Sequence, residues 1–104
     1  MSSEDDKPSP ELDKLIHEPA RLQIMSQLYA IDEADFIFLM RKTGLTWGNL
    51  SSHMSKLEKA EYIEVRKEFI GKKPNTVLKL TPKGRTAFDT YRAALRKILE
   101  DIPE

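Results

Sequence analysis

Apolar and polar side chains recur with helical spacing over residues 46–60, the most informative part of the chain. Leu50, Met54 and Leu57 lie three and four residues apart, which predicts a helix with one core-facing edge. The other edge carries Asn, Ser, His and Lys, although Ser and Asn lower helix stability by competing for backbone groups. Such an edge indicates donors and acceptors offered to a partner, and the edges of DNA bases are one such partner.

A second helix is predicted just before this one, over residues 36–43. Gly44 is a natural stop for it, because glycine readily adopts the left-handed conformation at a helix end. Thr46 is a good N-cap for the next helix, since its hydroxyl can accept from a free amide of the first turn. This spacing fits a helix-turn-helix, whose second helix enters the major groove.

Two strand-like runs follow, over residues 62–70 and 75–80. Each has alternating residues that share a face, namely Ile63, Val65 and Phe69, then Thr76, Leu78 and Leu80. Gly-Lys-Lys-Pro at residues 71–74 joins them, so the pair predicts a β-hairpin. The predicted fold class is α+β and mainly helical, a winged helix-turn-helix with a two-stranded wing and a long C-terminal helix.

The N-terminal region is expected to contain a tail and a short helix. Residues 1–9 are polar and acidic, so they predict a disordered tail ahead of one domain over residues 10–104. Apolar positions then begin a short helix, at Leu12, Leu15 and Ile16. That helix is interrupted at Pro19, which suits the first turn of the next helix.

The remaining boundaries come from a connector and a capped helix start. Residues 31–35 are interpreted as a connector, with Phe36 contributing to a minimal third strand. Thr81 and Pro82 are an N-cap and a first-turn proline, so the last helix is predicted over about residues 82–102.

Three segments carry a family resemblance. Leu-Ser-Ser-His-Met-Ser-Lys-Leu-Glu-Lys-Ala at residues 50–60, followed after Glu61 by Tyr-Ile, looks like the recognition-helix signature of MarR/ArsR-type winged-helix transcriptional regulators. Pro-Asn-Thr at 74–76 with Leu-Thr-Pro-Lys-Gly-Arg at 80–85 resembles their second wing strand and following helix start. Glu-Pro-Ala-Arg-Leu at 18–22 is similar to their first core helix. The resemblance implies a compact single-domain regulator that binds duplex DNA.

Two positions depart from that family pattern. Glu61 stands where the group usually has Gly, so we expect a weaker stop for the recognition helix. Ile37 stands where a Ser or Thr cap commonly opens the second helix, so the sequence leaves that boundary open.

Charge is unevenly distributed although the net charge is zero. Residues 1–40 have three Lys/Arg and nine Asp/Glu, whereas residues 41–85 have eleven and four. The basic part coincides with the helix-turn-helix and hairpin, the parts expected to face phosphates. A solvated surface with chance clustering is the alternative, and the coincidence with the motif favours DNA.

Composition excludes several classes of protein. The chain has no Cys, so it has no disulfide scaffold or thiolate metal site, and no apolar run approaches the ~20 residues that span a bilayer. The polar N-terminus does not resemble a signal peptide, so a cytoplasmic location is expected. Acidic clusters at residues 5–6 and 32–35 lack His at metal-ligand spacing. We therefore expect no metal, no cofactor and no enzymatic activity.

Candidate DNA contacts lie on the recognition helix and the wing. The helix contributes Thr46, Asn49, Ser51, Ser52, His53 and Lys56, and the wing contributes Arg66, Lys72 and Lys73. Asn49, Ser52 and His53 are assigned to base edges or phosphates, and Thr46 and Lys56 to the backbone. For Ser51 the choice between a phosphate and its own helix is open. Trp47 has two interpretations, packing or the DNA edge, of which packing is favoured.

The last helix predicts a dimer. Its apolar seam has near-heptad spacing at Phe88, Tyr91, Leu95, Ile98 and Ile102, with help from Leu12, Leu15 and Ile16. Packing within one protomer would cover part of this stripe. The outer half is expected to pair with a second copy, which would place two recognition helices ~34 Å apart on an inverted-repeat site.

The predicted function is a homodimeric transcription factor that represses or modulates nearby genes by sequence-specific binding of double-stranded DNA. The alternative is a winged helix used for protein–protein contact, with its basic patch on an acidic partner. A cleft between the dimer helices could receive a small-molecule effector, but no residue identifies one.

Overall fold

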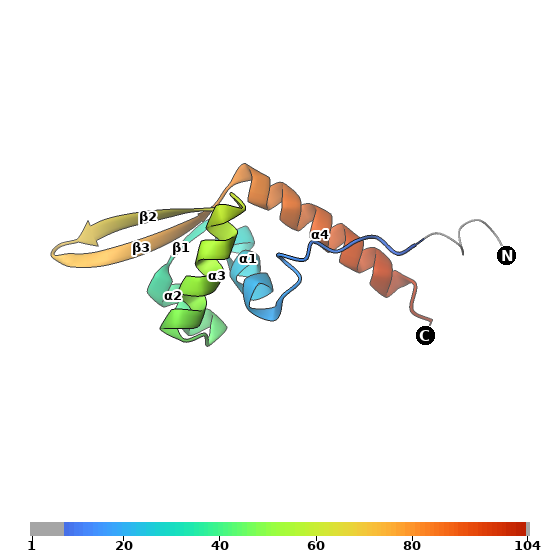
Figure 1. Ribbon diagram of the computed structural model, residues 1–104, viewed down its shortest axis with the longest axis horizontal. Helices are drawn as coiled ribbons and strands as arrows, with labels where there is room; N and C mark the ends of the chain where they lie inside the picture. Colours follow the sequence, from blue (N-terminus) through green and yellow to red (C-terminus); the bar gives the residue numbers. More distant parts are fainter. Residues whose placement is uncertain (1–7, 104) are drawn as a thin grey trace.

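The computed structural model describes residues 8–103 and contains four helices and three strands in that part of the chain (Figure 1). They run in the order α1 Pro19–Ile31, β1 Glu33–Asp35, α2 Phe36–Thr43, α3 Trp47–Lys59, β2 Ile63–Ile70, β3 Lys73–Leu80 and α4 Pro82–Glu100. This is the predicted winged helix-turn-helix with a long last helix. Most of the predicted tail, residues 1–7, lies outside the described residues.

Local capping explains where the helices begin and end. Gly44 ends α2 with φ +70°, and the Thr46 hydroxyl accepts the amide of Asn49 at 3.2 Å, as predicted. Asp35 caps α2 by accepting the Phe38 amide at 2.7 Å, which settles the boundary left open at Ile37. A carboxylate one residue before the helix thus replaces the expected hydroxyl.

The sheet contains a third strand earlier than predicted. Its order is β1-β3-β2 with antiparallel pairing throughout, and Ala34 of β1 lies opposite Leu78 of β3. The prediction that residues 31–35 are only a connector was therefore wrong, and so was Phe36 as a strand residue. Phe36 begins α2 and is buried in the core.

The core is an apolar cluster enclosed by α1, α2, α3, the first half of α4 and the inner part of the sheet. Its fully buried members are mostly branched aliphatic side chains, including Ile24, Leu28, Leu39, Leu50, Leu57 and Leu78. Fully burying each such side chain stabilises the fold by about 1.5–3 kcal/mol. This cluster fixes the orientation of α3 relative to α1 and the sheet.

No helix forms over residues 12–16, contrary to the prediction. The Asp13 carboxylate accepts the amides of Leu15 and Ile16, which closes a local turn in competition with a helix. The same carboxylate accepts the Tyr62 hydroxyl at 2.5 Å and ties this segment to the start of β2. Burial, together with the hydrogen bond to Asp13 and the charge of that carboxylate, raises the pKa of Tyr62 to about 12.

The molecule is elongated because the wing and α4 project on opposite sides of the helical body (Figure 1). Its extents are 66 × 25 × 21 Å, and its radius of gyration is 16.5 Å against the ~13 Å of a compact chain of this length. Neither projection adds to the core at its outer end. Among residues 8–103, no helix is long and apolar enough to cross a membrane.

Glu61 adopts the left-handed backbone at the end of α3, with φ +64°. A side chain at this conformation is strained, whereas glycine is not. We expect Glu61→Gly to raise the free energy of unfolding by about 1 kcal/mol in urea denaturation. Glu58→Gly, inside the last turn of α3, is the matched control and should lower that free energy by ~1 kcal/mol. An equal decrease in both variants would show that Glu61 is unstrained.

Candidate nucleic-acid interface

The recognition helix α3 is held in place by its apolar edge. Leu50 and Leu57 are fully buried and Met54 is half-buried, as the spacing predicted. The helix packs against α1 and β2, so its outer face cannot rotate without opening the core. The orientation of that face is therefore a fixed property of the fold.

The outer face of α3 carries a row of exposed polar side chains, here called the α3 stripe: Asn49, Ser52, Ser55, Lys56 and Lys59. Three of them were predicted as DNA contacts, and the structure leaves all three accessible. Ser55 and Lys59 were missed, although Ser55 lies three residues after Ser52 and Lys59 three residues after Lys56, which places them on the same face. Ser51 lies at the half-buried margin of this face, and the hydroxyl of Thr46 is exposed while it caps the helix.

His53 does not belong to the α3 stripe, contrary to the prediction. Its side chain is only 19% exposed and faces the N-terminus of α1, where Nδ1 lies 3.1 Å from the Arg21 guanidinium and 3.7 Å from the Glu18 carboxylate. Because a guanidinium only donates, Nδ1 must accept in that bond. The ring therefore links α3 to α1 and positions the recognition helix.

Glu18 and Arg21 complete this link. The Glu18 carboxylate caps α1 by accepting the Arg21 amide at 2.8 Å, and Arg21 Nε donates to the Leu15 carbonyl. Burial acts to raise the pKa of Glu18, but the amides of Arg21 and Ala20 and the positive charge of Arg21 outweigh it and lower that pKa. The charged carboxylate is thus the form that this cluster stabilises.

Trp47 opens α3 at the surface, so packing in the core of the protomer, one part of the favoured interpretation, was wrong, whereas packing in a dimer stays a prediction. The side chain is 62% exposed, with its ring centroid 4.5 Å from that of Phe36, which supports one face only. Gly48 follows, and a Cβ at this position would meet no atom within 4 Å. Packing within the chain therefore does not require glycine at this position.

The wing places cations at and near its tip. Lys72 and Lys73 are exposed at the turn, as predicted, and Lys67 is exposed on the strand leading to it. Arg66 differs from the prediction because it lies 3.7 Å from Glu33 and 3.4 Å from Glu68. These carboxylates neutralise part of its charge, so Lys67 is the better candidate on this strand.

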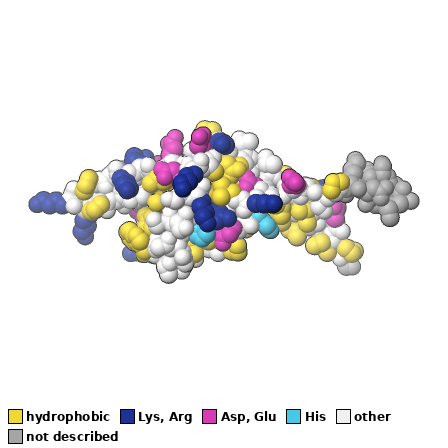
Figure 2. Space-filling model, in the orientation of Figure 1, with side chains coloured by type: hydrophobic (Ala, Val, Ile, Leu, Met, Phe, Trp, Pro, Cys, Tyr) yellow, Lys and Arg dark blue, Asp and Glu magenta, His cyan; other side chains and the backbone are white. Residues whose placement is uncertain are grey.

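Figure 2 shows where Lys and Arg gather on one face of the molecule. Dark blue side chains lie at the free end of the wing and across the middle of the body. The same view shows few carboxylates near the wing tip. Basic side chains are therefore present on both the helical body and the wing of this face.

The predicted dimer residues fall into two groups. Ile16, Phe88 and Tyr91 are buried in the core of one chain, so they cannot form a surface for a second copy, contrary to the prediction. The His17 ring also bonds the Tyr91 hydroxyl at 2.9 Å. Residues left accessible in part are Leu12, Leu15, Leu95 and Ile98, and Ile102 is 61% exposed.

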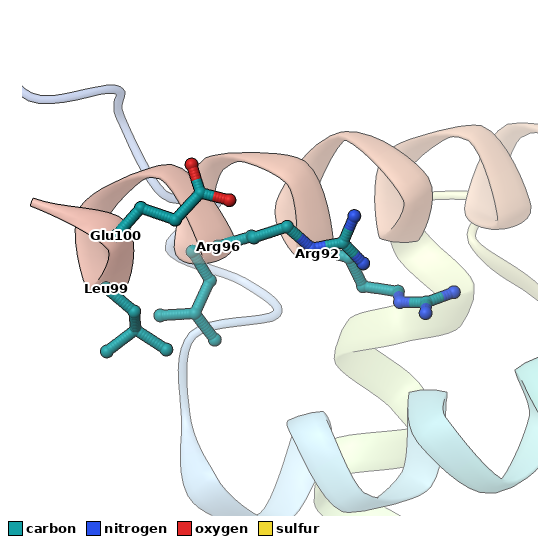
Figure 3. A pocket seen from close by; sticks show the side chains of 5 residues that line it. Arg92, Arg96, Leu99 and Glu100 are labelled. Carbon is teal, nitrogen blue, oxygen red and sulfur yellow. The ribbon is translucent and has the colours of Figure 1, made fainter.

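The outer half of α4 bears an open apolar groove. Leu95 and Leu99 form its apolar part, and Arg92, Arg96 and Glu100 border it (Figure 3). Leu99, which widens the predicted seam of the last helix, is 55% exposed and lies one turn from Leu95. Within residues 8–103, no group of three metal-ligating side chains lies close enough to hold an ion.

Comparisons with known proteins agree with this geometry. A family model described as winged helix DNA-binding domain matches residues 20–99. MJ0432, an uncharacterized protein of Methanocaldococcus jannaschii, is 34% identical over 89 residues, which make up 86% of this chain and 97% of that protein. The transcriptional regulator homologue protein from Pyrococcus horikoshii OT3 has a similar structure, with a TM-score of 0.78 and 29% identity over 85% of this chain and 89% of that one.

A MarR-family transcriptional regulator from Silicibacter pomeroyi shares the fold, with a TM-score of 0.59 at 22% identity over 86% of this chain and 62% of that one. The chain belongs to the winged-helix DNA-binding domain family. Its fold is that of MarR-like transcriptional regulators, as the sequence resemblance implied, and not that of an enzyme.

Proposed function

We propose that this protein is a transcriptional regulator, and specifically a repressor, that binds duplex DNA as a homodimer with α3 in the major groove. The α3 stripe is the observation that carries the proposal. It is a solvent-facing row of short polar side chains on a helix fixed by its core contacts. Nothing in the folding of the domain requires Asn and Ser there, since better helix formers would stabilise α3.

The proposed contacts divide by chemistry. Asn49, Ser52 and Ser55 have short donors and acceptors that suit base edges, where Asn can pair with adenine. Lys56 and Lys59 have long cationic side chains that suit phosphates on either side of the groove. Lys72 and Lys73 would contact the backbone or the neighbouring minor groove from the wing.

A dimer is supported by the exposed apolar side chains of α4. Leu99 and Ile102 are exposed and Leu95 and Ile98 are half-buried, so one protomer leaves part of this apolar row uncovered. Pairing of two such helices about a two-fold axis would bury this row and present two copies of α3 to successive major grooves, ~34 Å apart.

Selection of bound sequences from a random duplex pool tests the proposed function. We expect enrichment of an inverted repeat whose half-sites lie about 10 base pairs apart, centre to centre. The alternative function, contact with an acidic protein, predicts no enrichment and no binding to any duplex even at low salt. The second result would leave the α3 stripe without a DNA role.

Charge placed on α4 should separate the protomers. We expect Leu99→Asp with Ile102→Asp to weaken self-association roughly tenfold or more, because the interface would have to bury carboxylates. Sedimentation equilibrium measures the change. Thr90→Asp adds one such carboxylate on the opposite, exposed side of α4 and should leave the dimer unchanged. Equal association of all three proteins would place the interface elsewhere.

A further inference from the structure

The free end of the wing, residues 69–74 and here called the wing tip, is apolar on both faces. Phe69 is 73% exposed and Ile70 is 65% exposed, the highest values among the large hydrophobic side chains of the described residues. In the strand register Phe69 pairs with Pro74 on one face, and Ile70 pairs with Lys73 on the other. Phe69 and Ile70 therefore form a blunt apolar wedge directly behind the Gly71-Lys72 turn.

Packing within the fold does not explain why Phe69 and Ile70 are apolar, because nothing covers them. Strand β1 pairs with β3 only at residues 77–79, so the outer wing is a two-stranded ribbon with no layer packed on it. A two-residue turn, Gly71-Lys72, closes the ribbon, with φ +64° at Gly71 and no positive φ at Lys72. A glycine at this first position is typical of the tight type II′ turn, which holds the tip in one shape.

The positive charge around the wedge favours a polyanion as its binding partner. Lys67, Lys72 and Lys73 surround it, and no carboxylate of residues 8–103 forms an ion pair with any of them. The nearest carboxylate on the ribbon, Glu68, is occupied by Arg66 and Asn75. A second wing tip is a poor occupant, because two such tips would bring six cations together.

The length of the wing indicates that its tip reaches a minor groove. Six residues of extended strand separate the tip from Ile63 at the base of β2, a span of ~20 Å. Neighbouring grooves of one duplex lie about half a turn, ~17 Å, apart. If α3 occupies a major groove, the wing tip thus reaches the adjacent minor groove.

We propose that the wing tip is a wedge that enters this minor groove and partly unstacks a base step with Phe69 and Ile70, bending the duplex. This inference rests on the proposed function and adds a mode of recognition to it. The groove is ~6 Å wide, narrower than a hairpin with side chains, so the tip fits only where the groove opens. Apolar insertion opens it, and flexible pyrimidine–purine steps are the easiest to open.

Circularisation of DNA measures the bend without knowledge of the operator. The full chain is added to a linear duplex of about 150 base pairs, near one persistence length, and the rate of ligase closure into circles is recorded. We expect saturating protein to raise that rate roughly tenfold or more and to expose thymines to permanganate, which attacks unstacked bases. Phe69→Ser with Ile70→Ser should still bind but should close circles at the rate of free DNA.

Lys72→Gln with Lys73→Gln is the matched control, because it removes charge and keeps the wedge. This variant should need more protein for saturation and then close circles at the wild-type rate. If the Ser variant bends DNA as well as wild type, or if no thymine becomes reactive, the wedge is wrong while DNA binding stands. If the wild-type chain binds no duplex, the proposed function fails and the wedge with it.

Discussion

Raising the salt concentration from 50 to 200 mM is expected to lower the affinity of this protein for duplex DNA by ~10³–10⁵. This range follows if a dimer neutralises ~6–10 phosphates and releases their counterions. Lys56 and Lys59 of α3 with Lys72 and Lys73 of the wing provide eight such cations per dimer. Titration of a labelled duplex at several salt concentrations gives the slope of log affinity against log salt.

The wing lysines should account for a defined part of that slope. Lys72→Gln with Lys73→Gln removes four cations per dimer, so the slope should become shallower by ~3.6. Lys97→Gln is the matched control, since Lys97 is exposed on α4 at the far side of the molecule from the wing. A slope that is equally changed by both variants would indicate a general charge effect and no wing contact.

Replacing Gly84 should have the largest effect on stability. Gly84 lies in the first turn of α4, and a Cβ at this position would be 2.1 Å from the carbonyl oxygen of Tyr62. Backbone cannot yield as a flexible side chain can, so α4 would have to shift from the sheet. We expect Gly84→Ala to lower the free energy of unfolding by about 3 kcal/mol, a large part of the ~5–15 kcal/mol typical of a domain.

A second glycine provides the control for this prediction. Gly48→Ala adds the same methyl group in the first turn of a helix, where no atom lies within 4 Å of it. The free energy of unfolding should stay constant or rise by up to ~1 kcal/mol in urea denaturation. A similar decrease in the free energy of unfolding in both variants would show that the decrease comes from alanine in the first turn of a helix and not from the contact with Tyr62.

Local chemistry made much of the fold predictable. Gly44, Thr46 and the Thr81-Pro82 pair act through hydrogen bonds and backbone preferences within a few residues of themselves, so the sequence alone places the helix ends. The third strand was predicted at Phe36 and not at residues 33–35, because three residues carry too little periodicity to be told from a connector.

The errors in the candidate site have a different origin. Helical spacing shows which residues share a face but not which neighbour that face meets. His53 turns inward because α1 presents Glu18 and Arg21 to it, and Arg66 is engaged because β1 brings Glu33 alongside. In the same way, contacts with residues distant in sequence decide which apolar residues of α4 are buried in the protomer. Tyr91, for example, is buried and bonded to His17.

The exposed wing tip and Trp47 could not be placed from sequence for a related reason. Large apolar side chains are buried in most contexts, so packing is the favoured interpretation until a structure shows otherwise. Their exposure shows that the candidate DNA-binding surface also has apolar side chains, whereas the sequence analysis described this surface only by its charged and polar residues. Trp47 is the only tryptophan of the chain, so its fluorescence also reports on this surface.

Discrimination between sequences tests the central claim, that the α3 stripe reads DNA. Affinities are compared for the selected duplex and a scrambled duplex of the same composition. Asn49→Ala with Ser52→Ala should reduce the ratio of these affinities roughly tenfold or more, since each base contact discriminates by ~1–3 kcal/mol. Gln23→Ala, an exposed control on α1, should keep the ratio. Unchanged discrimination in the α3 variant would contradict the account.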